Sequence, residues 1–220
     1  MTGGPDQKRL AVAIRAILGR DASSEGLCQF GRYAELLLLW NRTHRITALE
    51  SAGEVFDHIF RDSLLVYPLL PVTPLRVADI GSGTGSPGVP LRIVDPGISL
   101  TLIESRRKRV SFLRMLQREI NLDDVRILHG RAEDLLRAHT ELESSLDVVL
   151  ARAVGPAASL ASTALRYLKP GGLFIASAPV ARKDQALGTD PVAVAGFERR
   201  DVSFPVLGIA RSFLIARKGS

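Results

Sequence analysis

The segment of the chain best suited to bind a ligand is glycine-rich, VADIGSGTGSPG at Val77–Gly88. Glycine permits a sharp backbone turn and a close approach by a ligand, because no Cβ intrudes. The GxGxxG spacing that begins at Gly83 also fits a dinucleotide fingerprint, so the glycines alone leave the ligand open. The acid at Asp79 and the missing amide donor at Pro87 are both unfavourable for a diphosphate, and a turn without a ligand is the alternative. The ligand contacts expected here are Asp79, Gly81, Gly83 and Gly85.

Two later acidic positions indicate a nucleoside-containing ligand. Glu104 ends an expected strand, where a carboxylate can accept hydrogen bonds from both ribose hydroxyls of NAD or S-adenosylmethionine. The turn Gly130–Asp134 can meet an adenine edge, with backbone contacts expected at Ala132 and Glu133. Its two acids could equally be placed against the dipole of a helix N-terminus. The turn LKPGG at Leu168–Gly172 resembles one of class I methyltransferases, which favours S-adenosylmethionine over NAD.

Arg152 is the candidate catalytic residue. It follows an expected central strand of a parallel sheet, so it can face the crevice where ligands of such sheets bind. There it would position the substrate or the cofactor, through a phosphate, a guanine O6 or the surroundings of the cofactor. The alternative is an ion pair with Asp147 or Glu133.

Basic residues form a second candidate surface. The chain has a net charge of +6, which indicates either a polyanionic partner or a compositional bias toward arginine. At 100° per residue, Arg107, Arg114 and Arg118 share one helix face, opposite the apolar face that contains Leu113 and Leu116. This face would suit RNA phosphates, with a solvated helix surface as the alternative.

Several kinds of chemistry are excluded by the composition. A single cysteine, Cys28, allows no internal disulfide or cysteine-rich zinc site, and its place near the N-terminus does not suit carbon-5 pyrimidine methylation. No apolar run approaches the roughly 20 residues of a membrane span, and no signal peptide is expected. A cytoplasmic monomer without metal is expected.

The segment Ala151–Pro156 lacks the Pro-Pro-aromatic pattern of exocyclic amine methylation, which leaves an acceptor such as guanine N7. Such an acceptor needs orientation and desolvation more than a general base.

The pattern of elements predicts an α/β fold with N-terminal helices. Residues 1–74 are expected to form a helical extension and residues 75–220 a Rossmann-like domain, packed as one compact unit. The expected strands are Leu75–Ile80, Ser99–Ile103, Val125–His129, Leu146–Ala151, Leu173–Ser177 and a C-terminal hairpin of Gly196–Phe204 and Gly208–Arg217. The expected helices are Gln7–Leu18, Glu25–Arg42, Glu54–Leu70, Val89–Val94, Arg106–Ile120, Ala132–His139 and Ala157–Leu168.

Taken together, these segments resemble the bacterial small-subunit ribosomal RNA guanine-N7 methyltransferases, once called glucose-inhibited division protein B. The resemblance runs from about Phe30 to Lys218, and the combination of SPGVP, ESRRK and ARAV is its most specific part. The matching segments are Tyr33–Asn41, Ile46–Ala48, His58–Leu64, Asp79–Pro90, Ile103–Arg109, Phe112–Arg114, His129–Asp134, Ala151–Val154 and Leu168–Gly172.

The resemblance implies a class I S-adenosylmethionine-dependent methyltransferase with a mostly parallel seven-stranded sheet and an antiparallel C-terminal hairpin. It implies methyl transfer to N7 of one guanine in 16S ribosomal RNA, supplied as RNA or as the 30S subunit. Arg45, Ser86 and Ser177–Pro179 depart from the family pattern. The implied cofactor contacts are Gly81, Ser86, Glu104, Ala132, Glu133 and Arg152, and the expected substrate contacts are His58, Arg107, Arg114 and Arg118.

Three other functions fit parts of the sequence. A methyltransferase of a small molecule would use the same cofactor site without the basic face. A dehydrogenase would bind NAD at the same glycine-rich turn. A non-catalytic RNA-binding protein would keep the basic face and would not need the intact Gly81–Gly85 turn with Glu104. His58 also has a structural alternative, a hydrogen-bond pair with Asp62.

Overall fold

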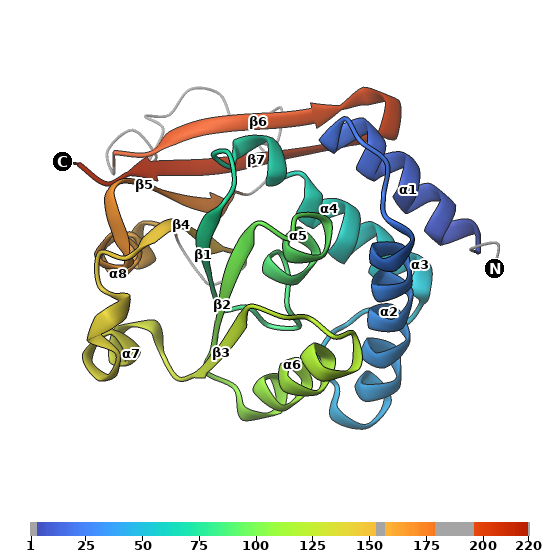
Figure 1. The fold of residues 1–220 in the computed structure, drawn as a ribbon, viewed down its shortest axis with the longest axis horizontal. Coiled ribbons are helices and arrows are strands. Elements are labelled where there is room, and N and C mark those ends of the chain that lie inside the picture. Colours follow the sequence, from blue (N-terminus) through green and yellow to red (C-terminus); the bar gives the residue numbers. More distant parts are fainter. Residues whose placement is uncertain (1–3, 153–156, 179–195, 220) are drawn as a thin grey trace, which may run out of the picture.

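A seven-stranded β-sheet organises the chain in the computed structural model, which describes residues 4–152, 157–178 and 196–219. The strand order is β3-β2-β1-β4-β5-β7-β6; β1 to β5 are parallel, and β7 is antiparallel to both β5 and β6 (Figure 1). The strands are β1 (Leu75–Ile80), β2 (Ile98–Glu104), β3 (Val125–His129), β4 (Leu146–Ala151), β5 (Leu168–Ser177), β6 (Glu198–Phe204) and β7 (Ile209–Arg217). The predicted α/β class and C-terminal hairpin are confirmed.

Helices cover both faces of this sheet. They are α1 (Pro5–Leu18), α2 (Ser24–His44), α3 (Ala52–Val55), α4 (Asp62–Leu64), α5 (Gly88–Val94), α6 (Arg107–Glu119), α7 (Ala132–Ala138) and α8 (Ala157–Tyr167). In Figure 1 the helices α7 and α8 lie to the left of the sheet, and the N-terminal helices with α5 and α6 lie to the right. Both faces of the parallel strands are therefore removed from water, as the near-continuous apolar composition of these strands requires.

Alternation along β1 assigns its side chains to these two layers. Val77 packs in the apolar cluster that contains the N-terminal helices, whereas Ala78 and Ile80 pack in the cluster that contains α7 and α8. Successive side chains of a strand point to opposite faces, so Asp79 points to the same face as Val77. That face is covered by α5, and this placement decides the environment of the Asp79 carboxyl group.

The helix predicted over Glu54–Leu70 is wrong as one continuous element. The segment starts with α3, passes through a π-helical turn at Phe56–Arg61, and ends as α4 followed by a 3₁₀ turn at Tyr67–Leu69. Pro68 cannot donate the backbone hydrogen bond that would extend an α-helix. A π-helical turn contains one more residue than an α-helical one, and it commonly marks a functional segment.

The predicted turn at Leu168–Gly172 is also not separate from the fifth strand. β5 already begins at Leu168, which pairs with Leu146, and the register with β4 shifts before Leu173 pairs with Val148. Gly171 has a φ of 78°, which a residue with a side chain rarely adopts. The fifth strand therefore begins with an irregular, glycine-dependent segment. The motif positions Ala153, Val154 and Pro179 lie outside the described residues.

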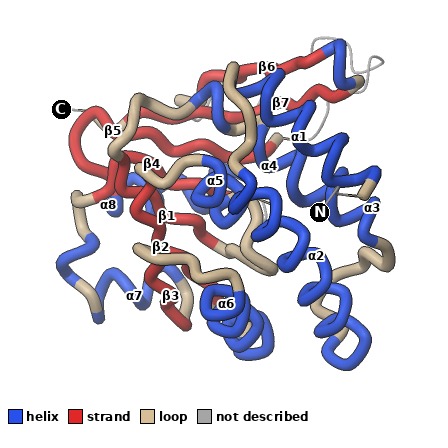
Figure 2. Tube along the Cα trace, turned by 45° about the vertical axis from the view of Figure 1, so that its right-hand side comes forward, coloured by secondary structure: helices blue, strands red, loops and turns tan. Residues whose placement is uncertain are grey.

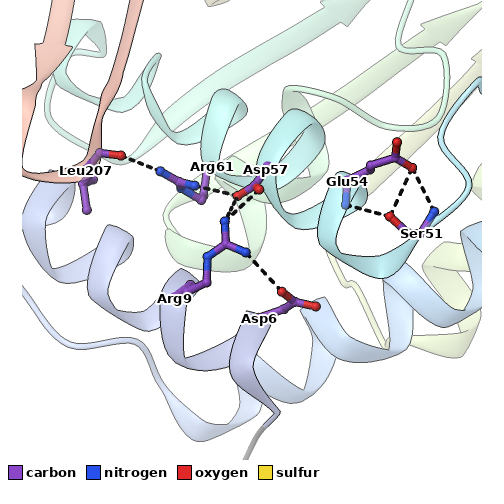
Figure 3. A network of polar contacts seen from close by, with 7 residues as sticks. All are labelled: Asp6, Arg9, Ser51, Glu54, Asp57, Arg61 and Leu207. Carbon is purple, nitrogen blue, oxygen red and sulfur yellow. Dashed lines mark hydrogen bonds and ion pairs between the residues drawn. The ribbon is translucent and has the colours of Figure 1, made fainter.

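A carboxylate between two arginines ties the first helix to the rest of the chain. Asp57, in the π-helical turn, accepts hydrogen bonds from Arg9 of α1 at 2.7 Å and from Arg61 at 2.5 Å (Figure 3). Arg61 also donates to the Leu207 carbonyl of the C-terminal hairpin at 2.8 Å. In Figures 1 and 2 α1 lies near the turn of the β6–β7 hairpin, so the first helix and the C-terminal hairpin lie close together here.

Aromatic side chains fill the space between α2 and the π-helical turn. The Phe60 ring is buried, and its centroid lies 4.8 Å from that of Phe30, 5.0 Å from that of Tyr33 and 5.0 Å from that of Phe56. Farther along α2, the Trp40 ring lies 6.2 Å from that of Phe112 in α6. Packing thus continues from the N-terminal helices to the helices that cover the sheet.

Because the two parts share one apolar cluster, we expect residues 1–74 and 75–220 to unfold together. Phe60→Ala should lower the free energy of unfolding by about 3–5 kcal/mol, since it removes a buried ring. Trp40 is the single tryptophan, so its fluorescence reports the N-terminal part while far-ultraviolet circular dichroism reports the whole chain. Both transitions should shift together, and the exposed control Leu39→Ala should shift neither. A Trp40 transition that moves alone would show two independent units.

Candidate active site

A cavity of about 720 Å³ opens at the carboxyl ends of the parallel strands. It lies where β1 has β2 on one side and β4 on the other, so the loops after these strands diverge. Its floor and sides are lined by residues that follow four strands: Gly81–Thr84, Glu104–Arg106, Gly130–Glu133 and Arg152. The N-terminal part supplies the remaining wall through Ile46–Leu49, His58 and Ile59. The volume is in the range of small-molecule sites.

The glycine-rich turn places its glycines in two different roles. Gly81, Gly83 and Gly85 have φ values of 71°, 59° and 105°, in the region that side chains rarely adopt. A Cβ on Gly83 would meet its nearest atoms only at 3.7 Å and would enter the cavity, whereas a Cβ on Gly85 would lie 2.8 Å from the Tyr33 hydroxyl. Gly83 therefore keeps room for a ligand, and Gly85 keeps room for α2.

Asp79 lies beneath the cavity rather than in its wall. Its carboxylate is fully buried, and Oδ2 accepts a hydrogen bond from the backbone N–H of Gly88 at 2.9 Å. Its Oδ1 has no hydrogen-bond partner among the described residues. Burial raises the pKa of Asp79 to about 7, although the hydrogen bond from Gly88 and the charge of Arg152 both lower it. Asp79 thus fixes the start of α5 under the glycine turn, and it is not among the residues that line the cavity.

Glu104 connects the ends of two strands. Its Oε2 accepts a hydrogen bond from Gly83 N–H at 2.9 Å, and its Oε1 accepts one from Arg106 N–H at 2.7 Å. Arg109 adds an ion-pair contact of 3.7 Å to Oε2. An ionised carboxylate offers about four acceptor positions, so two remain for donors from the cavity. Glu104 can therefore hold two hydroxyl groups without releasing the turn.

Ala132 and Glu133 begin α7 at the far side of the cavity. The Ala132 carbonyl accepts a hydrogen bond from the Tyr167 hydroxyl at 2.7 Å, and Glu133 accepts a long one from Thr163 at 3.4 Å. Both residues line the cavity. Helix α8 therefore fixes the turn in which backbone contacts to an adenine edge are predicted.

Arg152 occupies the wall between the sheet and the N-terminal helices. Its Nη2 lies 2.7 Å from Oδ2 of Asp62 and donates to the His58 carbonyl at 2.8 Å, while Nη1 donates to Ser86 Oγ at 2.7 Å. The alternative pairing with Asp147 or Glu133 is wrong for the part of the chain that is described. Asp147 instead accepts from the Arg76 backbone N–H at 2.8 Å and pairs with Lys169.

The structure also shows a carboxylate that the sequence interpretation gave no catalytic role. Asp62 belongs to the matching segment His58–Leu64, where it was considered only as a partner for His58. In the structure its carboxylate meets Arg152 instead, and the backbone carbonyl of His58 contacts the same guanidinium. Asp62 and Arg152 are 90 positions apart, so no short-range sequence pattern could have predicted that they pair.

The predicted basic face lies outside the cavity. Arg107, Arg114 and Arg118 are exposed on α6, while Leu113 and Leu116 are buried on its other side, as the helical periodicity predicts. The arginines that line the cavity besides Arg152 are Arg106, Arg109 and Arg131. The sequence pattern did not assign these three to the site. Arg106 and Arg109 lie within the predicted helix Arg106–Ile120, but periodicity alone does not show which helix face borders the cavity.

Comparison with known proteins identifies the family. The family model of rRNA small subunit methyltransferase G matches residues 27–205. The chain belongs to this family. The ribosomal RNA small subunit methyltransferase G of Clostridium kluyveri is 37% identical over 72% of this chain and 67% of its own length. The namesake protein of Lactococcus lactis subsp. lactis is 35% identical over 79% of this chain and 73% of its own length. The predicted methyltransferase class is thereby confirmed, and the dehydrogenase alternative is wrong.

The fold is also similar to that of solved methyltransferases. A solved S-adenosylmethionine-dependent methyltransferase from Aquifex aeolicus superposes with a TM-score of 0.55 at 14% identity, covering 79% of this chain and 97% of that one. The cavity fits S-adenosylmethionine as its cofactor, since Gly83 leaves open space and Glu104 keeps free acceptor positions. Within the three described ranges, no three His, Cys, Asp or Glu side chains are grouped to hold a metal ion, and no helix is long and apolar enough to span a membrane.

Gly83→Ala should weaken S-adenosylhomocysteine binding at least tenfold, because the added methyl group enters the cavity. Gly208 is the matched control, since its φ of 62° is close to the 59° of Gly83 and a Cβ there meets nothing within 4 Å. Each substitution should cost about 1–2 kcal/mol of stability through the left-handed backbone. Isothermal titration calorimetry should then show lost affinity in Gly83→Ala only. Equal affinities in the two variants would mean that Gly83 does not border the cofactor.

Asp79→Asn should change how stability depends on pH. The pKa of Asp79 is higher in the folded state than in the unfolded state, where it is about 4. The contribution of Asp79 to the free energy of unfolding is therefore fully present below the unfolded pKa and is lost as pH rises through about 7. The free energy of unfolding of wild type relative to Asp79→Asn should therefore fall by on the order of 2 kcal/mol between pH 5 and pH 8. Urea unfolding at the two pH values measures this difference.

Asp57→Asn provides a control of opposite sign. Although partial burial opposes it, hydrogen bonds from Arg61 and Arg9 lower the pKa of Asp57. The wild-type advantage over this variant is present above the unfolded pKa and is lost as pH falls below it. A difference between wild type and Asp79→Asn that does not vary from pH 5 to pH 8 would show that the buried carboxyl group keeps an ordinary pKa.

Proposed function

We propose that the chain transfers a methyl group from S-adenosylmethionine to N7 of a guanine in 16S ribosomal RNA. The observation that carries this proposal is the cavity at the strand ends, bordered by Gly83 and Glu104, in a member of the rRNA small subunit methyltransferase G family. The relatives named above act on small-subunit ribosomal RNA by their names. The target atom follows from the resemblance of the sequence to guanine-N7 methyltransferases.

We expect different residues of the cavity wall to contact different parts of S-adenosylmethionine. The backbone of Gly81 and Gly83 leaves room for close approach, and Glu104 would accept hydrogen bonds from the ribose hydroxyls. The backbone of Ala132 and Glu133 would meet the adenine edge. When bound, S-adenosylmethionine would supply a methyl group on a sulfonium. Its carbon–sulfur bond would break as the guanine N7 lone pair bonds to the methyl carbon, and the positive charge would pass to the guanine.

The chain needs to position the acceptor more than to remove a proton from it. Guanine N7 carries a free lone pair and loses no proton on methylation, so holding and desolvating the base provide the rate enhancement. Arg152 is suited to this task, because a guanidinium can donate to guanine O6 while N7 stays open to the methyl group. His58 contributes its backbone carbonyl, which orients Arg152. Its imidazole ring is assigned no step.

Basic side chains around the cavity suit the RNA backbone. Arg106, Arg109 and Arg131 line its mouth, and Arg107, Arg114 and Arg118 extend the charge over the exposed face of α6. Contacts to phosphates set position and orientation on RNA without reading its sequence. Aromatic residues make up 5% of the chain, which does not favour recognition by base stacking. We accordingly propose that the chain acts as a cytoplasmic monomer on 16S RNA or on the 30S subunit.

Methylation of RNA by the purified chain tests the proposal. The protein is incubated with methyl-labelled S-adenosylmethionine and either 30S subunits or naked 16S RNA, and the modified nucleotide is mapped. We expect label at N7 of one guanine, in a reaction that weakens steeply with salt because phosphate contacts release counterions. Label that appears only on small molecules, or on another atom of the RNA, would overturn the proposal.

A triple variant tests the α6 face in the same reaction. Replacing Arg107, Arg114 and Arg118 by Gln should weaken RNA binding and reduce the slope of log K against log salt by up to about 3, roughly one per lost phosphate contact. S-adenosylhomocysteine affinity should not change, because these side chains do not line the cavity. Arg15→Gln, at an exposed pair on α1, is the control with no expected effect on RNA binding. An unchanged salt slope in the triple variant would place the RNA elsewhere.

A further inference from the structure

The guanidinium of Arg152 is held from one side by the N-terminal part of the chain. Asp62 and His58 contact its Nη2 at 2.7 and 2.8 Å, and both belong to the segment that includes the π-helical turn. Ser86, from the glycine-rich loop, accepts from Nη1 at 2.7 Å. Three acceptors from two separate segments therefore fix the plane of one guanidinium at the cavity wall.

The hydroxyl groups beside Arg152 can adopt only one hydrogen-bond direction. Ser63 donates to the Ile59 carbonyl, because a carbonyl oxygen can only accept. The single hydroxyl hydrogen of Ser63 is then used, so in the 2.8 Å contact between Ser63 and Ser86 the donor is Ser86. A lone pair of Ser86 is thereby presented to Arg152. The hydroxyl of Ser86 thus accepts a hydrogen bond from Arg152, whereas the family resemblance had implied a direct contact with the cofactor.

Asp62 is the acidic side chain that contacts Arg152 among the described residues, and it forms ion pairs with two arginines. Its Oδ2 pairs with Arg152, and its Oδ1 pairs with Arg211 from the C-terminal hairpin. The Asp62 side chain is only 10% exposed. Two cations compensate for the burial of this carboxylate, and ion pairs away from water depend strongly on both partners being present. Asp62 therefore connects the cavity wall to the hairpin as well as to the helices.

We propose that Asp62 is a positioning residue that sets the orientation of Arg152 and offsets its charge during methyl transfer. The inference rests on the proposed function, in which the acceptor base becomes cationic. A guanidinium without a counter-ion would oppose that charge, because like charges at close range raise the energy of the product. With Asp62 beside it, Arg152 can donate to the acceptor at a smaller electrostatic cost. Asp62 thus acts on the reaction through Arg152, without touching the substrate.

Asp62→Asn tests this role, because asparagine keeps the shape and one acceptor oxygen while it removes the charge. We expect kcat to fall about tenfold or more, as for the loss of a charged hydrogen-bonded partner. KM for RNA should change less than about twofold, since phosphate contacts on other residues dominate RNA binding. Because a general loss of folded protein would also lower the apparent kcat without changing KM, kcat is calculated from the active fraction, which is measured by titration with S-adenosylhomocysteine.

Asp57→Asn is the matched control. Asp57 lies five positions earlier in the same helical segment and also pairs with two arginines, Arg9 and Arg61 (Figure 3). Neither of these arginines lines the cavity, whereas Arg152 does. Its replacement should cost stability in that segment and leave kcat within about twofold of wild type. Should Asp57→Asn and Asp62→Asn lower kcat equally, the Asp62 effect would be structural and the proposal would fail.

A second readout needs neither RNA nor turnover. In protein with ¹⁵N-labelled arginine, the Arg152 side-chain Nε–H resonance is assigned by its absence in Arg152→Lys. Asp62→Asn should shift this resonance and speed its hydrogen exchange, while Asp57→Asn should leave it unchanged. An unaltered Arg152 resonance in Asp62→Asn would overturn the positioning role even if activity fell.

Coupling between the two residues completes the test. If Asp62 acts through Arg152, then adding Asp62→Asn to Arg152→Lys should reduce kcat much less than it does in wild type. Equal reductions in both backgrounds would contradict the proposal. Wild type that fails to methylate either RNA would refute the proposed function alone, because the resonance and exchange measurements would still decide whether Asp62 positions Arg152.

Discussion

The arrangement of the site depends on one topological constraint, the change of winding direction at β1. With β2 on one side of β1 and β4 on the other, the connections after β1 and β4 run to opposite faces of the sheet and leave a crevice between them. Parallel strands end at the same edge, so Gly83, Glu104 and Arg152 reach that crevice from three different strands. No side chain has to be carried far from a rigid element, which keeps the cavity walls precise.

The sheet alone leaves this crevice open on one side, and the N-terminal helices close it. The Tyr33 hydroxyl donates to the Thr84 carbonyl in the glycine-rich turn, and α2 packs so closely there that Gly85 can have no side chain. The π-helical turn adds the contacts to Arg152 from His58 and Asp62. The helices therefore take part in the chemistry of the site as well as in the core, and their separation from the sheet would open the cavity wall.

The sequence was sufficient to predict the α/β class and the placement of the glycine-rich turn and Glu104 at the ends of strands, because each follows from local spacing. It could not predict the contact between Asp62 and Arg152, since that contact depends on how two distant segments pack. Asp79 shows a different limit. Its position before the first glycine suggested a ligand contact, but strand alternation turns its side chain toward α5, where it accepts from Gly88. The arginines that line the cavity besides Arg152 were not assigned to it, because helical periodicity groups side chains on one face without showing what that face borders.

The buried carboxyl group of Asp79 has a consequence for its neighbour Glu104. Two negative charges beneath one turn would repel each other, and the charge of Glu104 indeed contributes to the raised pKa of Asp79. With a pKa of about 7, Asp79 is partly protonated near neutral pH, which reduces the negative charge beneath the turn. Glu104 can then use its acceptor positions for the amides of Gly83 and Arg106 and for hydroxyl groups of a ligand. The acid that first suggested a ligand contact thus lies below the turn, where partial protonation lessens its repulsion with Glu104.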